Sequence, residues 1–383
     1  MPRHIQSAAL TAFLQTLIRT QTLSGAEKPG LDLVAAEMNR LQFDAINADA
    51  YGNVVGLING NHAGPTLLLD AHIDTVPVSP GLPWNYEPFG ATIDNGRMYG
   101  RGTADMKGAL AAMIHAAAAV DRSQLAGRII VCASVMEEVM EGIPLTPVIE
   151  AYAPDLVVIG EATDLNVVHG GRGRAELQLE ALGIPTHSST PHLGRNAIHV
   201  MMGAIGAIEA LPMHEDPLLG PSVMGLTDII SDPYPGHSVI PSRCLATYDR
   251  RLLAEETIDS VLGELQALPE MEHVNVRISD GSYTTYTGAV LTCPKFFPAW
   301  KLPSDHAFVQ QALAGVRTAD LDPNLSAYRF NTNATYTAGL LGIPTIGFGP
   351  AQESRAHMID EYIELDELEA AARGYLGIME TLR

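Results

Sequence analysis

The sequence of 383 residues contains few cysteines, few basic residues and no long apolar segment. Its three cysteines, Cys132, Cys244 and Cys293, are too few and too scattered for a disulfide framework or a cysteine-based zinc site. Lysine and arginine total 23 against 44 aspartates and glutamates, which gives a net charge of −21. A chain this acidic has no broad electrostatic surface for nucleic acid or for anionic membranes, so we expect neither as a partner.

No segment of the sequence suggests a membrane span or a targeting signal. The longest apolar run, residues 108–120, contains His115 and is too short to cross a bilayer, so it suits a buried helix. The first residues carry polar side chains throughout and lack the pattern of a signal peptide. We therefore expect a cytoplasmic protein.

What the chain does contain is a globular composition rich in carboxylates. Apolar residues make up 46% and charged residues 17%, which excludes a disordered chain. The length suffices for about two or three domains and for a full hydrophobic core. Most of the 44 carboxylates must be solvated surface groups, and the question is whether a few converge with some of the 13 histidines on a metal.

Strand and helix signals alternate in the first third of the chain. Apolar runs bounded by glycine or proline predict strands, and an alanine-rich stretch predicts a helix that packs closely against a sheet. This alternation, with continuous apolar strands, indicates an α/β sheet covered on both faces. The predicted strands are residues 53–58, 66–69, 128–135 and 156–160, and the predicted helix is 104–119.

The pattern changes near residue 173 and changes back near residue 290. In between, segments that alternate apolar and polar residues, as half-exposed antiparallel strands do, accompany two predicted helices. We therefore predict one discontinuous α/β domain, residues 1–174 and 288–383, interrupted by a smaller α+β domain, residues 175–287. The smaller domain has predicted strands at 175–182, 244–250 and 274–278 and helices at 196–211 and 255–268; the returning α/β pattern comprises 307–316, 344–348 and 364–382.

Histidine and acidic residues follow several predicted strands, where open α/β sheets build their sites. His72 and Asp74 are two apart on an extended chain and point the same way, so Asp74 could orient His72 through its second ring nitrogen. Alone, such a pair is more often an ordinary surface or core pair. Glu161 follows another apolar strand and His357 precedes a helix, and either could equally be an unremarkable surface residue.

A glycine-rich segment, GRGTADMKG at residues 100–108, is comparable to a phosphate-binding loop. Asp105 occupies the place of the third glycine of the dinucleotide motif, where a carboxylate would repel a pyrophosphate. The glycines instead let the backbone turn tightly and present Asp105 at the start of the predicted helix. Asp105 could also simply cap that helix, and the two roles are compatible.

Glu137 and Glu138 directly follow the strand predicted at 128–135. Adjacent carboxylates repel each other unless a cation or a proton lies between them. Their side chains diverge on an extended chain, so one can bind a metal while the other faces a substrate; the alternative is a pair of solvated loop residues. All these segments together offer two histidines and three carboxylates as ligands, with one carboxylate to spare.

Oxygen and imidazole ligands suit zinc, cobalt or manganese and exclude thiolate chemistry. Two ions about 3.5–4 Å apart, bridged by one carboxylate, would hold a water or hydroxide and polarise a carbonyl group. The spare carboxylate would then serve as general base.

The motifs HID, GRGTADMKG, MEE, GEAT, a glycine-then-histidine segment and AHMIDEYI occur in this order along the chain. With them the sequence resembles, over essentially its whole length, the M20 family of co-catalytic zinc aminoacylases, deacylases and exopeptidases, which includes acetylornithine deacetylase, succinyl-diaminopimelate desuccinylase and carboxypeptidase G2. The last third is most similar to a branch of uncharacterised peptidases and deacetylases, some of them labelled selenium-metabolism hydrolases. The resemblance implies a dinuclear-zinc exopeptidase-like catalytic domain with an inserted, ferredoxin-like α+β lid and dimerisation domain.

The resemblance also implies roles for the residues picked out above. Two divalent ions are expected, zinc first, with cobalt or manganese as alternatives. Glu137 matches the general base that takes a proton from the water bridging the ions, and Asp74 matches the partner of His72. The implied ligands are His72 and Glu161 for one ion, Glu138 and His357 for the other, and Asp105 as the bridge between them.

The segment GIPTHSSTPHLGRNAI resembles the family's lid and dimerisation domain. In dimeric members the histidine at the position of His187 reaches into the partner's site and stabilises the oxyanion; the alternative is a helix-capping segment with a buried histidine. In YDRRL, Arg251 matches the arginine that often holds the substrate carboxylate, a task that suits its planar fork. Arg250 would take this role if the register were shifted by one.

Two positions depart from the family pattern. Ser238 stands where asparagine is common, and Asn333 stands where aspartate is frequent. Neither supplies a metal ligand, and we expect both to face the substrate, so they bear on which substrate is used and not on the reaction.

The sequence therefore predicts a homodimeric, dinuclear metal-dependent amide hydrolase, a deacylase or dipeptidase. Its substrates would be small N-acyl amino acids or peptides with a free carboxylate. A carbamoyl-amide hydrolase or an aminopeptidase on the same scaffold is an alternative. A non-catalytic metal-binding scaffold protein is another, although such a protein would not need Glu137 beside Glu138.

Overall fold

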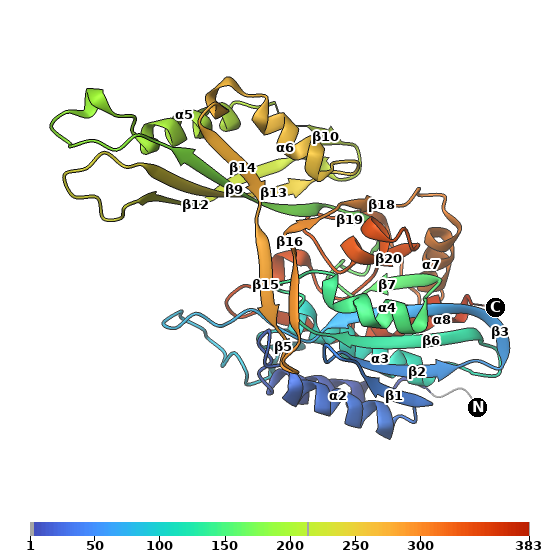
Figure 1. The fold of residues 1–383 in the computed structure, drawn as a ribbon. Helices are drawn as coiled ribbons and strands as arrows, with labels where there is room; N and C mark the ends of the chain where they lie inside the picture. Colours follow the sequence, from blue (N-terminus) through green and yellow to red (C-terminus); the bar gives the residue numbers. More distant parts are fainter. Residues whose placement is uncertain (1–3, 213, 383) are drawn as a thin grey trace.

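The computed structural model describes residues 4–212 and 214–382 and contains two large sheets. One sheet forms the centre of a compact body, and the other lies in an arm that projects from it (Figure 1). The body sheet has nine strands, of which β6, β3, β7 and β20 run parallel at its centre. Its order is β1 (Ala45–Ala48), β2 (Val54–Asn59), β6 (Ala126–Ser134), β3 (His62–His72), β7 (Leu156–Ile159), β20 (Thr345–Gly347), β8 (Val167–Gly171) and β18 (Trp300–Lys301), with β19 (Leu325–Tyr328) paired to β8.

Both faces of the body sheet are covered, which confirms the predicted α/β architecture. Successive residues of β3 alternate between two apolar clusters: Leu67 and Leu69 belong to one, and Leu68 belongs to the other. Burial on both faces requires apolar side chains at successive positions, which explains the continuous apolar run in the sequence of this strand. The first cluster includes α1 (Ser7–Ile18), α2 (Lys28–Arg40), α3 (Gly108–Ala119), α7 (Ala307–Arg317) and α8 (Leu365–Glu380), and the second includes α4 (Thr146–Tyr152).

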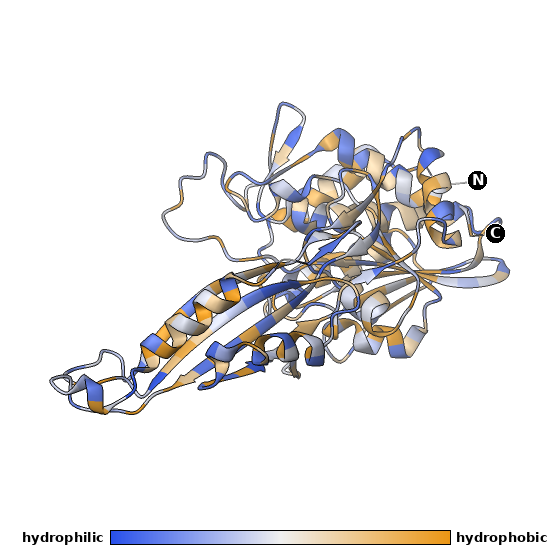
Figure 2. Ribbon diagram, turned by 90° about the horizontal axis from the view of Figure 1, so that it is seen from above, coloured by the Kyte–Doolittle hydropathy of each residue, from blue (hydrophilic) through white to orange (hydrophobic). Residues whose placement is uncertain are grey.

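The arm is an α+β unit with its own apolar core. Strand β9 (Gly173–Leu182) alternates buried and half-buried residues because helices cover one of its faces only. The core of the arm includes Leu177, Leu179 and Tyr248 and shares no member with the clusters of the body. In Figure 2 the helices lie along the sheet and the whole arm extends away from the body. The remaining arm elements are β12 (Val223–Asp232), β13 (Arg243–Leu252), β14 (Val274–Ile278), α5 (Ala197–Glu209) and α6 (Ile258–Gln266), in the sheet order β12-β13-β9-β14, with β17 (Phe296–Phe297) also paired to β9.

A hairpin of β15 (Asp280–Thr284) and β16 (Val290–Pro294) returns the chain from the arm to the body. At its tip the Tyr286 hydroxyl donates to the Gly52 carbonyl at 2.9 Å, and the Thr287 hydroxyl donates to the Ala50 carbonyl at 2.8 Å. The division of the chain that we proposed at 287/288 falls in the turn of this hairpin, and the one at 174/175 falls within β9.

Two small sheets and several short helical turns complete the described residues. The sheets are β21 (Tyr362–Glu364), β5 (Arg97–Tyr99) and β4 (Thr92–Asp94), and β10 (Glu215–Asp216) with β11 (Gly220–Pro221). The turns are η1 (Thr103–Lys107), η2 (Ile143–Leu145), η3 (Pro191–Leu193), η4 (Pro269–Met271), η5 (Thr335–Leu340) and η6 (Glu353–Arg355). Within the described part of the chain, none of the helices is both long and apolar enough to span a bilayer.

The helix predicted from residue 104 begins later. Asp105 and Met106 have non-helical backbone angles, and the peptide bond between them is cis. The regular helix α3 therefore starts at Gly108, with Lys107 as its N-cap residue. Asp105 does not cap a helix, and its carboxylate is free for another purpose.

Candidate metal centre and substrate cavity

The predicted ligands gather at one edge of the body sheet. His72 is the last residue of β3, Glu138 follows β6, and Glu161 follows β7. His357 comes from the loop after β20, and Asp105 comes from η1. Because the carboxyl ends of parallel strands meet at one edge, residues far apart in the sequence lie together here.

Their side chains form two groups of three that share one carboxylate. In the first group, the His72 Nε2 atom lies 2.9 Å from Asp105 Oδ1 and 3.4 Å from Glu161 Oε1. In the second, the His357 Nε2 atom lies 3.1 Å from Asp105 Oδ2 and 3.2 Å from Glu138 Oε2. The candidate ligand atoms of each group all lie within 4.8 Å of one another. Asp105 thus turns one oxygen to each group, as a carboxylate that bridges two ions would.

The carboxylates of the cluster need cations to balance their negative charge. Burial raises the pKa of Glu137 well above its ordinary value, and burial, aided by Asp105, raises that of Glu161 to about 7. Hydrogen bonds with Asp105 and Glu138 raise the pKa of His357 to about 10. Several carboxylates are therefore crowded together and short of positive charge. Two imidazoles and three carboxylates are a donor set that suits divalent ions, and the residues fit two of them.

Asp74 supports the cluster differently from the prediction. The His72 Nδ1 atom lies 2.9 Å from the Asp74 backbone carbonyl but 3.6 Å from its carboxylate, which is too long for a hydrogen bond. The carboxylate accepts hydrogen bonds from the backbone N–H groups of Glu137 and Glu138, each at 3.2 Å, and from the Ser24 hydroxyl at 2.7 Å. Asp74 therefore holds the loop that carries both glutamates, and its main chain orients His72.

Glu361 is a supporting residue that the sequence interpretation missed. Its Oε1 atom accepts hydrogen bonds from the N–H groups of Gly102, Ala104 and Asp105, and Arg101 donates to Oε2 at 2.6 Å. Burial raises its pKa to about 7, against the opposing effect of Arg101. The available signal was its place in the motif AHMIDEYI. Glu361 fixes the glycine-rich turn that presents Asp105.

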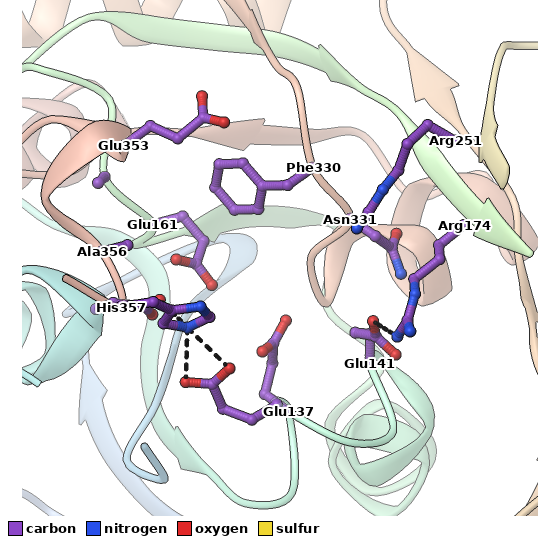
Figure 3. A pocket seen from close by; sticks show the side chains of 13 residues that line it. Glu137, Glu141, Glu161, Arg174, Arg251, Phe330, Asn331, Glu353, Ala356 and His357 are labelled. Atoms are coloured by element: carbon purple, nitrogen blue, oxygen red, sulfur yellow. Dashed lines mark hydrogen bonds and ion pairs between the residues drawn. The ribbon is translucent and has the colours of Figure 1, made fainter. Parts of the chain in front are cut away.

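A cavity of about 340 Å³ opens beside the ligands (Figure 3). Glu137, which belongs to neither group of three, points into it. Arg251 lines the opposite side, whereas Arg250 is buried and paired with two glutamates of the arm. The structure thus distinguishes the two arginines that the sequence left open. The other lining residues are Asp105, Glu138, Glu141, Glu161, Ala162, Arg174, Phe330, Asn331, Glu353, Ala356 and His357.

Arg174 joins Arg251 in the cavity wall and was not anticipated. The register of β9 and β13 places the two arginines directly opposite each other. Asp249 lies between them, accepting from Arg174 Nε at 2.7 Å and lying 3.1 Å from Arg251 Nε. Glu141 contacts Arg174 at 3.1 Å from the side of the body. The carboxylates offset the repulsion that like charges at opposed strand positions would otherwise produce.

Asn333 does not face the cavity. It is 2% exposed, and its amide nitrogen donates to Asp70 at 2.8 Å and to Ser134 at 3.2 Å. Its amide oxygen accepts from the Gly142 N–H at 2.6 Å. The expectation of a substrate contact is therefore corrected: the side chain turns into the interior and ties β3 to the loop after β6.

The segments that carry His187 and Ser238 are paired with each other: His187 forms an isolated bridge with Val239, and the Ser188 N–H donates to the Ser238 carbonyl at 3.1 Å. Both are exposed and neither lines the cavity of its own chain. His187 is exposed, so it is not the buried histidine of the alternative interpretation, although Asn196 of the same segment does cap α5. Ser238 therefore has no place for a substrate contact within one chain.

Comparison with known proteins assigns the chain to a family. The model of peptidase family M20/M25/M40 matches residues 68–381. The uncharacterized protein YgeY of Escherichia coli (strain K12) is 32% identical over 381 residues, covering 97% of this chain and 94% of that protein. An acetylornithine deacetylase of Salmonella arizonae is 32% identical over 324 residues, covering 80% of this chain and 78% of that protein.

Solved structures share the whole fold. Aminopeptidase PepT from Bacillus cereus superposes with a TM-score of 0.77 at 18% identity, over 98% of this chain and 99% of that one. The YXEP protein of Bacillus subtilis, described as a dinuclear metal binding peptidase of the M20 family, gives 0.74 at 13% identity, over 98% and 97%.

The family model, the relatives and the two groups of ligands agree with one another. They show a metal-dependent hydrolase that acts on amide or peptide bonds and uses two divalent ions. They leave no support for a non-catalytic scaffold protein. The chain belongs to the peptidase family M20/M25/M40.

Proposed function

We propose that this enzyme removes the acyl group from small N-acyl amino acids that carry a free α-carboxylate. The observation that carries the proposal is the arrangement of the cavity: two groups of ligands share Asp105, Glu137 stands free beside them, and Arg251 faces them from the other side. Amide cleavage and carboxylate recognition then lie within one cavity.

We propose zinc as the physiological metal, because two histidines and three carboxylates offer each ion a nitrogen ligand and a small set of oxygens. Cobalt and manganese suit the same donors. His72 and Glu161 would hold one ion, His357 and Glu138 the other, and Asp105 both. Bound divalent ions polarise a carbonyl group and make water a better nucleophile at neutral pH.

Glu137 carries the proton in the proposed reaction. Its carboxylate is buried, points into the cavity and lies 3.7 Å from His72 Nε2, so it is held next to the metal ligands without being one of them. It takes a proton from the attacking water as the new C–O bond forms. It then gives that proton to the amide nitrogen as the C–N bond breaks, which leaves a carboxylate and a free amine.

We propose that the protein works as a homodimer through the arm. His187 is exposed and does not line the cavity of its own chain, so the cavity that it would serve belongs to a second copy. The edge strand β12 also exposes Val223, Leu226, Ile229 and Ile230. His187 would donate to the oxygen that becomes negative during the reaction.

We propose a cytoplasmic location. Cys132, Cys244 and Cys293 are all free, which suits a reducing compartment.

A dipeptidase or aminopeptidase is the second candidate, and one observation favours it. Glu353 lines the same cavity, on a different side from Arg174 and Arg251 (Figure 3). Its carboxylate could hold the ammonium group of an unblocked peptide. A carbamoyl-amide hydrolase has no comparable residue in its favour.

The first experiment is hydrolysis of a panel of N-acetyl amino acids and dipeptides, with zinc, cobalt or manganese added in turn. The Glu137→Gln variant should bind two ions per chain and lose about 10²–10⁴-fold in kcat, because the proton carrier is gone and the ligands are intact. Glu353→Gln serves as the matched control, since it should weaken dipeptide hydrolysis only. Near-normal turnover by Glu137→Gln would overturn the assigned role.

A further inference from the structure

Asn331 lies in the wall of the cavity with an unpaired side-chain amide. The residue is 7% exposed, yet neither Oδ1 nor Nδ2 finds a hydrogen-bond partner among the residues that the structure describes. Buried polar atoms in native proteins are nearly always paired. An amide that lines the cavity without a partner (Figure 3) therefore points to a ligand that supplies both a donor and an acceptor.

The neighbouring residues explain why this amide is left for a ligand. The Asn333 side chain is bonded inside the body, as described above, and the Thr332 hydroxyl accepts from the Ala334 N–H at 3.2 Å. Phe330 is an apolar part of the cavity wall. The loop is therefore fixed by its other residues, and Asn331 is the one whose hydrogen-bonding groups are unused.

The position of Asn331 relates it to one part of the substrate. Figure 3 shows Asn331 between the side of the cavity with Glu137 and the side with Arg174 and Arg251. Along an N-acyl amino acid the scissile carbonyl, the N–H group and the α-carboxylate follow one another. With the carbonyl at Glu137 and the carboxylate at the arginines, the N–H group comes to lie between them.

We infer that Asn331 is a positioning and specificity residue for the leaving amino acid, an inference that rests on the proposed function. Its Oδ1 atom accepts a hydrogen bond from the N–H of the scissile amide, and its Nδ2 atom donates one to the α-carboxylate. The substrate class is thereby narrowed to secondary amides of α-amino acids. Holding the N–H also leaves the nitrogen lone pair that develops during cleavage free to take the proton from Glu137.

The test compares an amide with an ester that lacks only the N–H group. The probes are an N-acetyl amino acid hydrolysed by the wild-type protein and the O-acetyl 2-hydroxy acid with the same side chain. Asn331→Leu should lower kcat/KM on both, because the carboxylate contact is lost from both. The fall should be about 10-fold larger on the amide, which alone loses the N–H contact.

Phe330→Leu is the matched control from the same wall of the cavity. It removes apolar contact and no hydrogen bond, so it should leave the ratio of amide to ester kcat/KM unchanged. Metal content and melting temperature are measured for every variant. If Asn331→Leu fails to fold, Asn331→Ala is tested against the same expected ratio.

Equal falls on amide and ester, in a folded variant with two ions, would overturn the role of Asn331 and leave the proposed function standing. A wild-type protein that holds two ions and cleaves no N-acyl amino acid would overturn the proposed function, and the inference with it.

Discussion

The edge of the body sheet that carries the predicted metal ligands, which we call the metal edge, differs from the arm in how its charges are balanced. At the metal edge, Asp105, Glu137, Glu138 and Glu161 crowd together, with two histidines as their near cationic partners. In the arm, charges are matched one against another: Arg250, for example, pairs with Glu256 and Glu264.

This contrast separates the two tasks of the enzyme. The buried Arg250 of the arm has carboxylate partners within the arm, whereas the buried carboxylates of the metal edge need added cations to balance their charge. Metal binding and the proton transfer proposed for Glu137 therefore depend on the body. The arm contributes Arg174 and Arg251, which lie where they can select a substrate. Each of the following predictions changes a residue in one region and compares the effects on metal content, turnover or stability that the two regions should show.

Asp105→Ala should have the largest effect. It removes the carboxylate that the two groups of ligands share, so we expect fewer than two bound ions per chain and a loss of about 10³-fold or more in kcat. Metal analysis and turnover at saturating substrate measure this. A variant that kept both ions and most of its activity would refute the bridging role.

His187→Ala should lower kcat by about 10²–10³-fold, the usual effect of losing one oxyanion donor, while the metal content stays at two. Mixing this variant with Glu137→Gln should restore activity, because a mixed dimer has one cavity with both residues intact. His192, an exposed histidine of the same loop, provides the control: its replacement by alanine should change nothing. Full activity of His187→Ala, or of a strictly monomeric protein, would contradict the proposed dimer.

Leu177→Ala should have the smallest effect on turnover. Leu177 is fully buried in the core of the arm, so its truncation should cost about 2–5 kcal/mol in the free energy of unfolding of the arm. Both ions should stay bound, because the ligands belong to the body. Chemical denaturation followed by metal analysis tests this, and loss of metal at low denaturant would show that the two regions are not separable.

The sequence predicts those parts of the molecule that depend on local pattern. His72, Glu138 and Glu161 stand in short motifs at the end of apolar strands, Asp105 stands in a glycine-rich turn, and His357 stands in the motif AHMIDEYI. Parallel strands bring the first three positions to one edge. The change from continuous to alternating apolar residues locates the arm for the same reason, since one face of β9 is open.

The parts that escape prediction depend on pairings between distant segments. Arg174 becomes a cavity residue only through the register that sets it opposite Arg251, which joins strands far apart in the sequence. Asn331 and Asn333 are two apart in one loop, yet one lines the cavity and the other is bonded to Asp70. Nothing in the local sequence tells which asparagine turns inward.

The hairpin of β15 and β16 has a mechanical consequence. The arm is attached to the body where β8 runs into β9, and again through this hairpin, whose tip is fastened at Gly52 by Tyr286. The β8–β9 connection is the point about which the arm could turn, and the hairpin is a second contact that restrains this turning. A swing of the arm that changed the gap between Arg251 and Glu137 would have to bend the hairpin or break the hydrogen bonds at its tip, so the hairpin opposes such a movement.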